Sequence, residues 1–202
     1  STGILTSSST STVKLTGDGA NETIGASGGG ITFYNLQVGV GSLTQNRTYS
    51  TTTITVTNVL TIGPTSGSYT ATLNINSGNT VTLSGTGTPL VLNDNGLGLT
   101  TGIIGNALGI VNYTGNGATV VTGATYYNLQ VGNAVTQTGS RTYTLGADTS
   151  VAGVLTIGSN TNNNGYLQTL DASSKTLTLS GTGTPFVINT YGAFTASSST
   201  VA

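Results

Sequence analysis

Apolar residues alternate with threonine and other polar residues along most of the chain. The alternation is plain in residues 54–56, 73–75, 81–83 and 177–179, where two aliphatic side chains flank a polar one. A period of two is typical of half-buried β-strands, and no segment has the period of a helix. The runs are four to seven residues long and are separated by Gly, Asn and Ser clusters, which favour turns. The sequence therefore predicts an all-β protein with many short strands.

The most strongly repeated stretch predicts the architecture. Residues 82–93 read TLSGTGTPLVLN, and residues 178–189 read TLSGTGTPFVIN. Fixed offsets between blocks are the mark of a repeat protein, and these offsets lie between 93 and 96 residues. We therefore divide the chain into two repeats of about 94 residues, at 1–105 and 106–202. Two further blocks recur in the same order: residues 34–39 return at 127–132, and residues 59–63 return at 154–158. Inward-facing core residues are expected among Leu83, Val91 and Leu92 and among Leu179, Val187 and Ile188.

Two all-β architectures fit such a repeat. One is a β-solenoid with coils of about 20 residues, which would give about ten coils. The other is a pair of tandem β-sandwich domains, which the hairpin-type dipeptides at 95–96, 116–117 and 164–165 favour. The two copies differ by insertions at turns while their strand blocks stay intact, and a solenoid absorbs such insertions as loops. We predict the solenoid, with the tandem sandwich as the alternative.

Composition argues against chemistry at an active site. Only 4% of the residues are charged, the net charge is −1, and the chain contains no His or Cys. Thiolate metal sites and the usual nucleophile–base pairs are therefore absent, and the weak field attracts neither nucleic acid nor an anionic membrane. We expect no enzymatic activity, no cofactor or metal, no nucleic-acid partner and no membrane insertion. The aspartates are scattered and do not recur between the repeats: Asp18, Asp94, Asp148 and Asp171.

Several polar and aromatic patterns have both a functional and a structural interpretation. Arg47 and Arg141 repeat with their neighbours, and they either contact a ligand or subunit or hold a loop; we favour the loop. The pairs 33–34 and 126–127 are either sugar-stacking platforms or wall residues, and we favour the wall. Threonine runs such as 51–57 suggest an ice-binding ladder, although their spacing is irregular. Three glycosylation sequons are no more than chance predicts: Asn21, Asn46 and Asn112.

Four motifs in a fixed order resemble a known class of repeats. They are YYNLQVG, RTYTLGAD, VLTIG and KTLTLSG, and the similarity extends over nearly the whole chain. The pattern resembles the repeats of large bacterial surface proteins of the filamentous-haemagglutinin and autotransporter-passenger type. This resemblance implies a β-solenoid in an extracellular, cell-surface structure or adhesin, and it supplies no catalytic residues.

The two ends of the chain resemble each other. Residues 194–201 are similar to residues 5–13, and Val13 and Val201 are 188 residues apart, which is twice 94. An uncapped β end invites another chain to pair with it. We therefore predict an extracellular structural protein whose copies join head to tail into a filament through their terminal strands. The predicted assembly residues are Leu5, Val13, Phe194 and Val201. The alternatives are an adhesin stalk, with surface glycans as partners, and an ice-binding solenoid.

Overall fold

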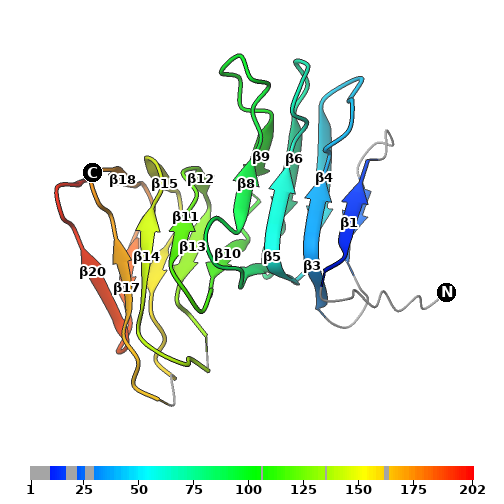
Figure 1. The fold of residues 1–202 in the computed structure, drawn as a ribbon. Coiled ribbons are helices and arrows are strands. Elements are labelled where there is room, and N and C mark those ends of the chain that lie inside the picture. The colour runs from blue at the N-terminus through cyan, green and yellow to red at the C-terminus, as the bar shows by residue number, and fades with distance from the viewer. Residues whose placement is uncertain (1–9, 17–21, 26–29, 106, 135, 162–163) are drawn as a thin grey trace.

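The chain forms a parallel β-solenoid of about seven turns (Figure 1). The structure is a computed structural model, and it describes residues 10–16, 22–25, 30–105, 107–134, 136–161 and 164–202. Every ladder between named strands is parallel, and the described residues contain no helix. Parallel pairing of successive coils confirms the predicted solenoid and excludes the tandem sandwich, whose sheets would be antiparallel.

The strands form one long sheet and three shorter ones. The long sheet holds, in order, β1 (Thr12–Leu15), β3 (Ile31–Val38), β5 (Ile54–Ile62), β7 (Thr80–Leu83), β10 (Ile110–Tyr113), β13 (Asn128–Val131), β16 (Leu155–Ile157) and β19 (Phe186–Ile188), with β8 (Leu90–Leu92) also paired to β5. The second sheet holds β2 (Glu22–Ile24), β4 (Arg47–Thr51), β6 (Ala71–Ile75) and β9 (Gly102–Gly105). The third holds β11 (Thr119–Val121), β14 (Arg141–Leu145), β17 (Gln168–Asp171) and β20 (Gly192–Thr195). The fourth holds β12 (Thr125–Tyr126), β15 (Thr149–Val151), β18 (Thr176–Leu179) and β21 (Thr200–Val201).

Most coils are longer than the sequence predicts, although the neighbours Val111 and Leu129 lie only 18 positions apart. Residues that are neighbours on successive coils lie 23 positions apart at Val13 and Leu36 and 31 apart at Ala71 and Gly102. The expected coil of about 20 residues and the expected ten coils are therefore wrong. Most strands have five residues or fewer, whereas β3 and β5 have eight and nine, and loops at the corners add to the coil length.

Each coil has three faces, which the repeated blocks identify. Face one holds the C-terminal halves of β3 and β5 with β8, and in the second repeat β13, β16 and β19. Face two holds β2, β4, β6 and β9, and then β11, β14, β17 and β20. Face three holds the N-terminal halves of β3 and β5 with β7, and then β12, β15 and β18. Residues at the same place in the two repeats are called equivalent below.

The core is a column of inward side chains that strand alternation selects. Leu83 and Leu90 of the repeated block are fully buried, whereas Val91 and Leu92 are half-buried and only Leu92 packs against the core. Neighbouring residues of a strand point to opposite faces, so Val91 and Leu92 do not both face inward. Four tyrosines are fully buried in the column: Tyr49, Tyr113, Tyr126 and Tyr143.

The asparagine that ends the repeated block closes a corner in both repeats. Asn93 Nδ2 donates to the Gly63 carbonyl at 2.6 Å, and Asn189 Nδ2 donates to the Gly158 carbonyl at 2.9 Å. Gly158 has a φ of 76°, and a Cβ on it would lie 2.4 Å from the backbone of Gly192. Only glycine fits this left-handed corner, which explains why the corner chemistry recurs in both copies.

Candidate functional site: the repeat junction and the open ends

The two repeats meet at β10, which pairs with a different face on each side. Val111 lies beside Val81 of β7, which belongs to face three of the first repeat. On its other side Val111 lies beside Leu129 of β13, which belongs to face one of the second repeat. Face one of the second repeat therefore stacks on face three of the first repeat.

The other two faces are displaced in the same way. The Val120 N–H donates to the Gly87 carbonyl at 2.6 Å, and the Thr122 hydroxyl donates to the Leu90 carbonyl. These contacts place β11, of face two, beside the segment that leads into β8, of face one. In the same sense β12, of face three, lies next to β9, of face two. The second repeat is thus rotated by one face about the solenoid axis.

The number of strand segments explains this rotation. Each repeat contributes eleven segments, β1–β9 and β10–β20, when the two halves of β3 and of β5 are counted separately. Three segments make one coil, so eleven segments stop one face short of four coils. Figure 1 shows the consequence: the loops after β3, β5 and β8 project upward, and the equivalent loops after β13 and β16 project downward.

A hydroxyl network holds the second repeat together at the junction. The Thr122 N–H donates to the Tyr113 hydroxyl at 3.2 Å, and the Tyr126 hydroxyl donates to the Thr122 carbonyl at 2.6 Å. The two tyrosine hydroxyls are 3.0 Å apart, and because the Tyr126 proton is already used, Tyr113 is the donor between them. Burial raises the pKa of Tyr113 to about 12 and raises that of Tyr126 well above its usual value. Both groups stay neutral at physiological pH.

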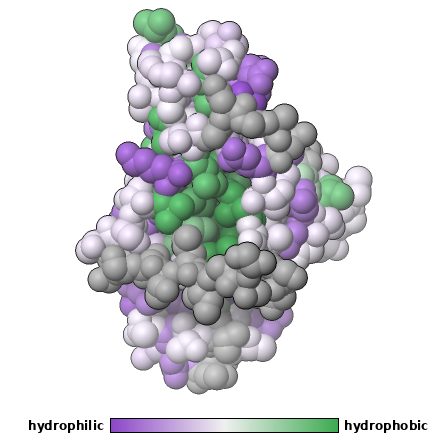
Figure 2. Space-filling view, turned by 90° about the vertical axis from the view of Figure 1, so that its right-hand side faces the viewer, coloured by the Kyte–Doolittle hydropathy of each residue, from purple (hydrophilic) through white to green (hydrophobic). Residues whose placement is uncertain are grey.

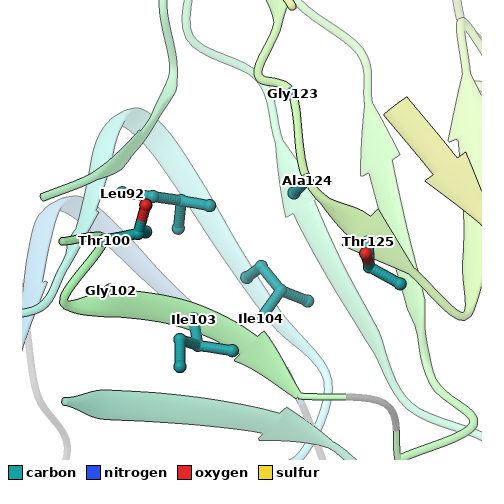
Figure 3. Close-up of a pocket in the computed structure, with 8 residues that line it drawn as sticks. All are labelled: Leu92, Thr100, Gly102, Ile103, Ile104, Gly123, Ala124 and Thr125. Atoms are coloured by element: carbon teal, nitrogen blue, oxygen red, sulfur yellow. The ribbon is translucent and has the colours of Figure 1, made fainter. Parts of the chain in front are cut away.

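The third side of the junction is open (Figure 3). The named strands β9 and β12 do not form a ladder, and a cavity of about 240 Å³ lies between them. Ile104 and Leu92 contribute its apolar part, whereas Ile103 points to the other side of β9 (Figure 3). No charged residue is among those that line it: Leu92, Thr100, Gly102, Ile103, Ile104, Gly123, Ala124 and Thr125. The opening separates β9 from β12, and the only side-chain polar groups among its lining residues are the hydroxyls of Thr100 and Thr125.

The C-terminal coil is the equivalent of the coil just before the junction, but its core side chains are exposed. Val111 is 2% exposed, whereas its equivalent Val201 is 47% exposed. The change from buried to half-buried also holds from Leu90 to Phe186 and from Leu83 to Leu179. The exposed core therefore reflects the position in the stack and not the residue types.

The N-terminal coil shows the same feature from the other side. Val13 and Leu15 of β1 pack against the core and stay partly exposed, whereas their equivalents Val111 and Tyr113 are buried. Figure 2 looks onto this end and shows an apolar area in its centre, bordered by polar residues and by residues whose placement is not described.

Three of the four predicted assembly residues are described, and they lie at these two ends. Val13 and Val201 are equivalent to each other, because both match Val111. Val13 pairs with Leu36 as Val111 pairs with Leu129. Val201 pairs with Leu177 as Val111 pairs with Val81. Phe194 is half-buried and meets Phe186 edge to face, with ring centroids 5.3 Å apart. Leu5 lies outside the described residues.

The repeated arginines hold loops. Arg141 donates from Nη1 to the Ser140 carbonyl at 2.9 Å and from Nη2 to the Thr138 hydroxyl at 3.1 Å. Arg47 is buried, and the Gln45 amide, oriented so that both groups are satisfied, accepts from it at 2.7 and 2.9 Å. These contacts agree with the structural interpretation. Of the two aromatic pairs, Phe33 and Tyr126 are core residues.

The three described aspartates accept hydrogen bonds from backbone N–H groups. Asp94 accepts from the Gly96 N–H and Asp148 accepts from the Thr176 N–H, both at 2.8 Å. Asp171 accepts from the Ser173 N–H and from the Ser197 hydroxyl. No group of three or more acidic side chains gathers in the part of the chain that the structure describes, and Asp18 lies outside it.

Two of the sequon asparagines are engaged in the fold. Asn46 Oδ1 accepts from the Thr70 N–H at 2.9 Å. Asn112 is buried, and its Nδ2 donates to the Asn133 carbonyl at 2.9 Å, so the folded protein shields this amide. Asn21 lies outside the described residues.

Threonines form a short ladder on face three of each repeat. Thr32, Thr55 and Thr82 are in register, and their equivalents Thr125, Ser150 and Thr178 form the second ladder. The rotation places the two ladders on different sides of the molecule. A long flat threonine face, which ice binding needs, is therefore interrupted at the junction.

An equivalent pair of exposed tyrosines was missed by the sequence analysis. Tyr69 and Tyr166 precede β6 and β17 and are 40% and 37% exposed. Their neighbours differ, so the pair belongs to no repeated block and only the ladder register reveals it.

Comparison of the chain with protein-family models, curated proteins and solved structures finds no match. The described residues also contain no helix with the length and hydropathy that a membrane-spanning helix needs. The candidate site is therefore defined by the geometry of the junction and the two ends.

Proposed function

We propose that this chain is a structural subunit of an extracellular, cell-surface filament and that its copies associate head to tail through their terminal coils. The observation that carries the proposal is the C-terminal coil, which exposes residues whose equivalents are buried at the repeat junction. Apolar area left in water favours association, at about 25 cal/mol for each Å² that becomes buried. The contact joins unlike ends, so it propagates instead of closing a dimer.

The low charge and the absence of a catalytic constellation in the described residues support a structural role. Copies of the chain are the proposed partners, and neither a cofactor nor a reaction is part of the proposal. The scarcity of lysine and the wealth of threonine and asparagine suit an exported surface protein.

Electron microscopy of the purified chain tests the proposal. We expect filaments of one solenoid width that lengthen with protein concentration. Val13→Asp places a charge in the proposed contact and should prevent filaments while the circular dichroism of the monomer stays unchanged. The control is Ser174→Asp, in an exposed turn of the C-terminal coil, which should assemble normally.

A chain that stays monomeric at every concentration would contradict the proposal. That result would favour the adhesin stalk, in which the solenoid is a spacer and the glycan-binding function lies elsewhere.

A further inference from the structure

The C-terminal coil and the coil before the repeat junction are built from equivalent strands. β18, β19 and β20 correspond to β7, β8 and β9 in ladder register, and β18 and β19 also correspond to β7 and β8 in sequence. At the junction the next layer begins with β10, which pairs with β7 over residues 110–113. The repeat junction therefore shows how a following repeat stacks on a coil that is equivalent to the C-terminal coil.

β10 makes two ladders, one on each side, and β1 and β21 each make only one of the two equivalent ladders. β21 keeps the ladder toward the preceding coil, because Val201 lies beside Leu177 as Val111 lies beside Val81. β1 keeps the ladder toward the following coil, because Val13 lies beside Leu36 as Val111 lies beside Leu129. If two copies join end to end, β21 of one copy and β1 of the next copy both fit the position beside β18.

We propose that the contact between subunits copies the repeat junction: β1 of the next copy replaces β21 on β18, so that the next copy is rotated by one face. This inference rests on the filament proposed above and specifies its geometry. β1 has the four residues of β10, whereas β21 has two, so β1 makes the longer ladder. Ile24, Phe33 and Leu36 of the next copy then take the places that Val121, Tyr126 and Leu129 have at the junction.

The ladder register predicts which outward side chains meet. At the junction Asn112 lies beside Thr82, and their equivalents are Lys14 of the next copy and Thr178. In a stack without rotation, face one of the next copy would lie on face one of the preceding copy. Lys14 of the next copy would then lie beside Val187 of β19 instead. Thr178 and Val187 belong to different faces, so a short contact from Lys14 reaches only one of them.

Cross-linking through introduced cysteines separates the two arrangements, because the chain has no native cysteine. The full chain is prepared as K14C/T178C and as K14C/V187C and allowed to assemble. Each sample is treated with a short thiol-specific cross-linker and run on a denaturing gel. In-register neighbours on parallel strands are about 4.8 Å apart, within the reach of such a reagent.

We expect a ladder of dimers, trimers and higher species from K14C/T178C and none from K14C/V187C. A second variant that lacks residues 200–202 should give the K14C/T178C ladder at lower protein concentration, because β21 no longer competes for β18. A ladder from K14C/V187C alone would overturn the rotated junction and leave the filament intact. Filaments in which K14C/T178C gives no ladder would also overturn it. Absence of filaments from the unmodified chain would instead reject the filament itself.

Discussion

The coil before the repeat junction and the C-terminal coil have nearly the same sequence and opposite surroundings. Both contain the TLSGTGTP block, the same parallel register and the same glycine corner. In the first coil the next repeat covers the core, and in the second coil the equivalent side chains are partly exposed. The same strand block therefore stands once inside the stack and once at its end, and the burial of its side chains differs accordingly.

The largest difference between the two coils is expected from identical truncations. Leu83→Ala removes a fully buried side chain and should lower the free energy of unfolding by about 2–5 kcal/mol. Leu179→Ala removes a half-buried side chain and should cost less than half as much in the monomer. Thermal and urea unfolding measure both variants. Equal losses would mean that the C-terminal coil is covered in solution.

Alkaline pH should weaken the junction more than the ends. The folded-state pKa of Tyr113 is about 12 and its unfolded value is 10.0, so the stabilisation is complete below pH 10 and is lost as the pH rises to 12. Two pKa units correspond to about 2–3 kcal/mol for this residue. Urea unfolding at pH 9 to 12 measures the loss.

Tyr113→Phe should reduce this dependence by the share of one tyrosine, because the hydroxyls of Tyr126 and Tyr143, whose pKa values burial also raises, remain. The matched control is the half-buried Tyr127, whose Tyr127→Phe change should leave the dependence in place. At the N-terminal end the equivalents of the two network tyrosines are Leu15 and Phe33, which have no hydroxyl. A wild-type protein whose stability is constant from pH 9 to 12 would disprove the buried network.

The smallest effect concerns the corner that the two coils share. Asn93→Ala and Asn189→Ala each remove a hydrogen bond to a glycine carbonyl and should each cost about 1 kcal/mol. Both asparagines make the same bond, so the two losses should be similar even though only one coil is covered. Thermal unfolding of the two variants decides this. A large loss for Asn93 alone would show that the corner also depends on the covering repeat.

The sequence predicts the strands and the repeat well, because alternation and repeated blocks record which side chains face inward. Leu83 and Leu90 belong to such a block and are core residues. The sequence does not predict the rotation, which depends on how many strand segments a repeat contains. Residues 31–38 and 54–62 each form one continuous strand that spans two faces. β10 also lies outside the repeated blocks, so nothing in its residues shows that it pairs with two different faces.

Coil length was mispredicted for a related reason. Loops at the corners, such as the one between Asn93 and Gly102, lengthen a coil without changing its strands. Their residues are polar and glycine-rich like any turn, so strand periodicity does not record how many of them a coil holds. The exposed Tyr69 and Tyr166 lie in such loops and stayed hidden for the same reason.

A helical reconstruction of the filament by electron cryo-microscopy tests the account most directly. From β1 to β20 each chain supplies twenty-two strand segments, which is seven coils and one further face. At about 4.8 Å per coil, successive subunits should be related by a rise of about 35 Å and a rotation of about a third of a turn beyond the twist of the sheets. A similar rise without that rotation, or subunits joined side by side, would contradict the claim that the repeat junction is the pattern for assembly.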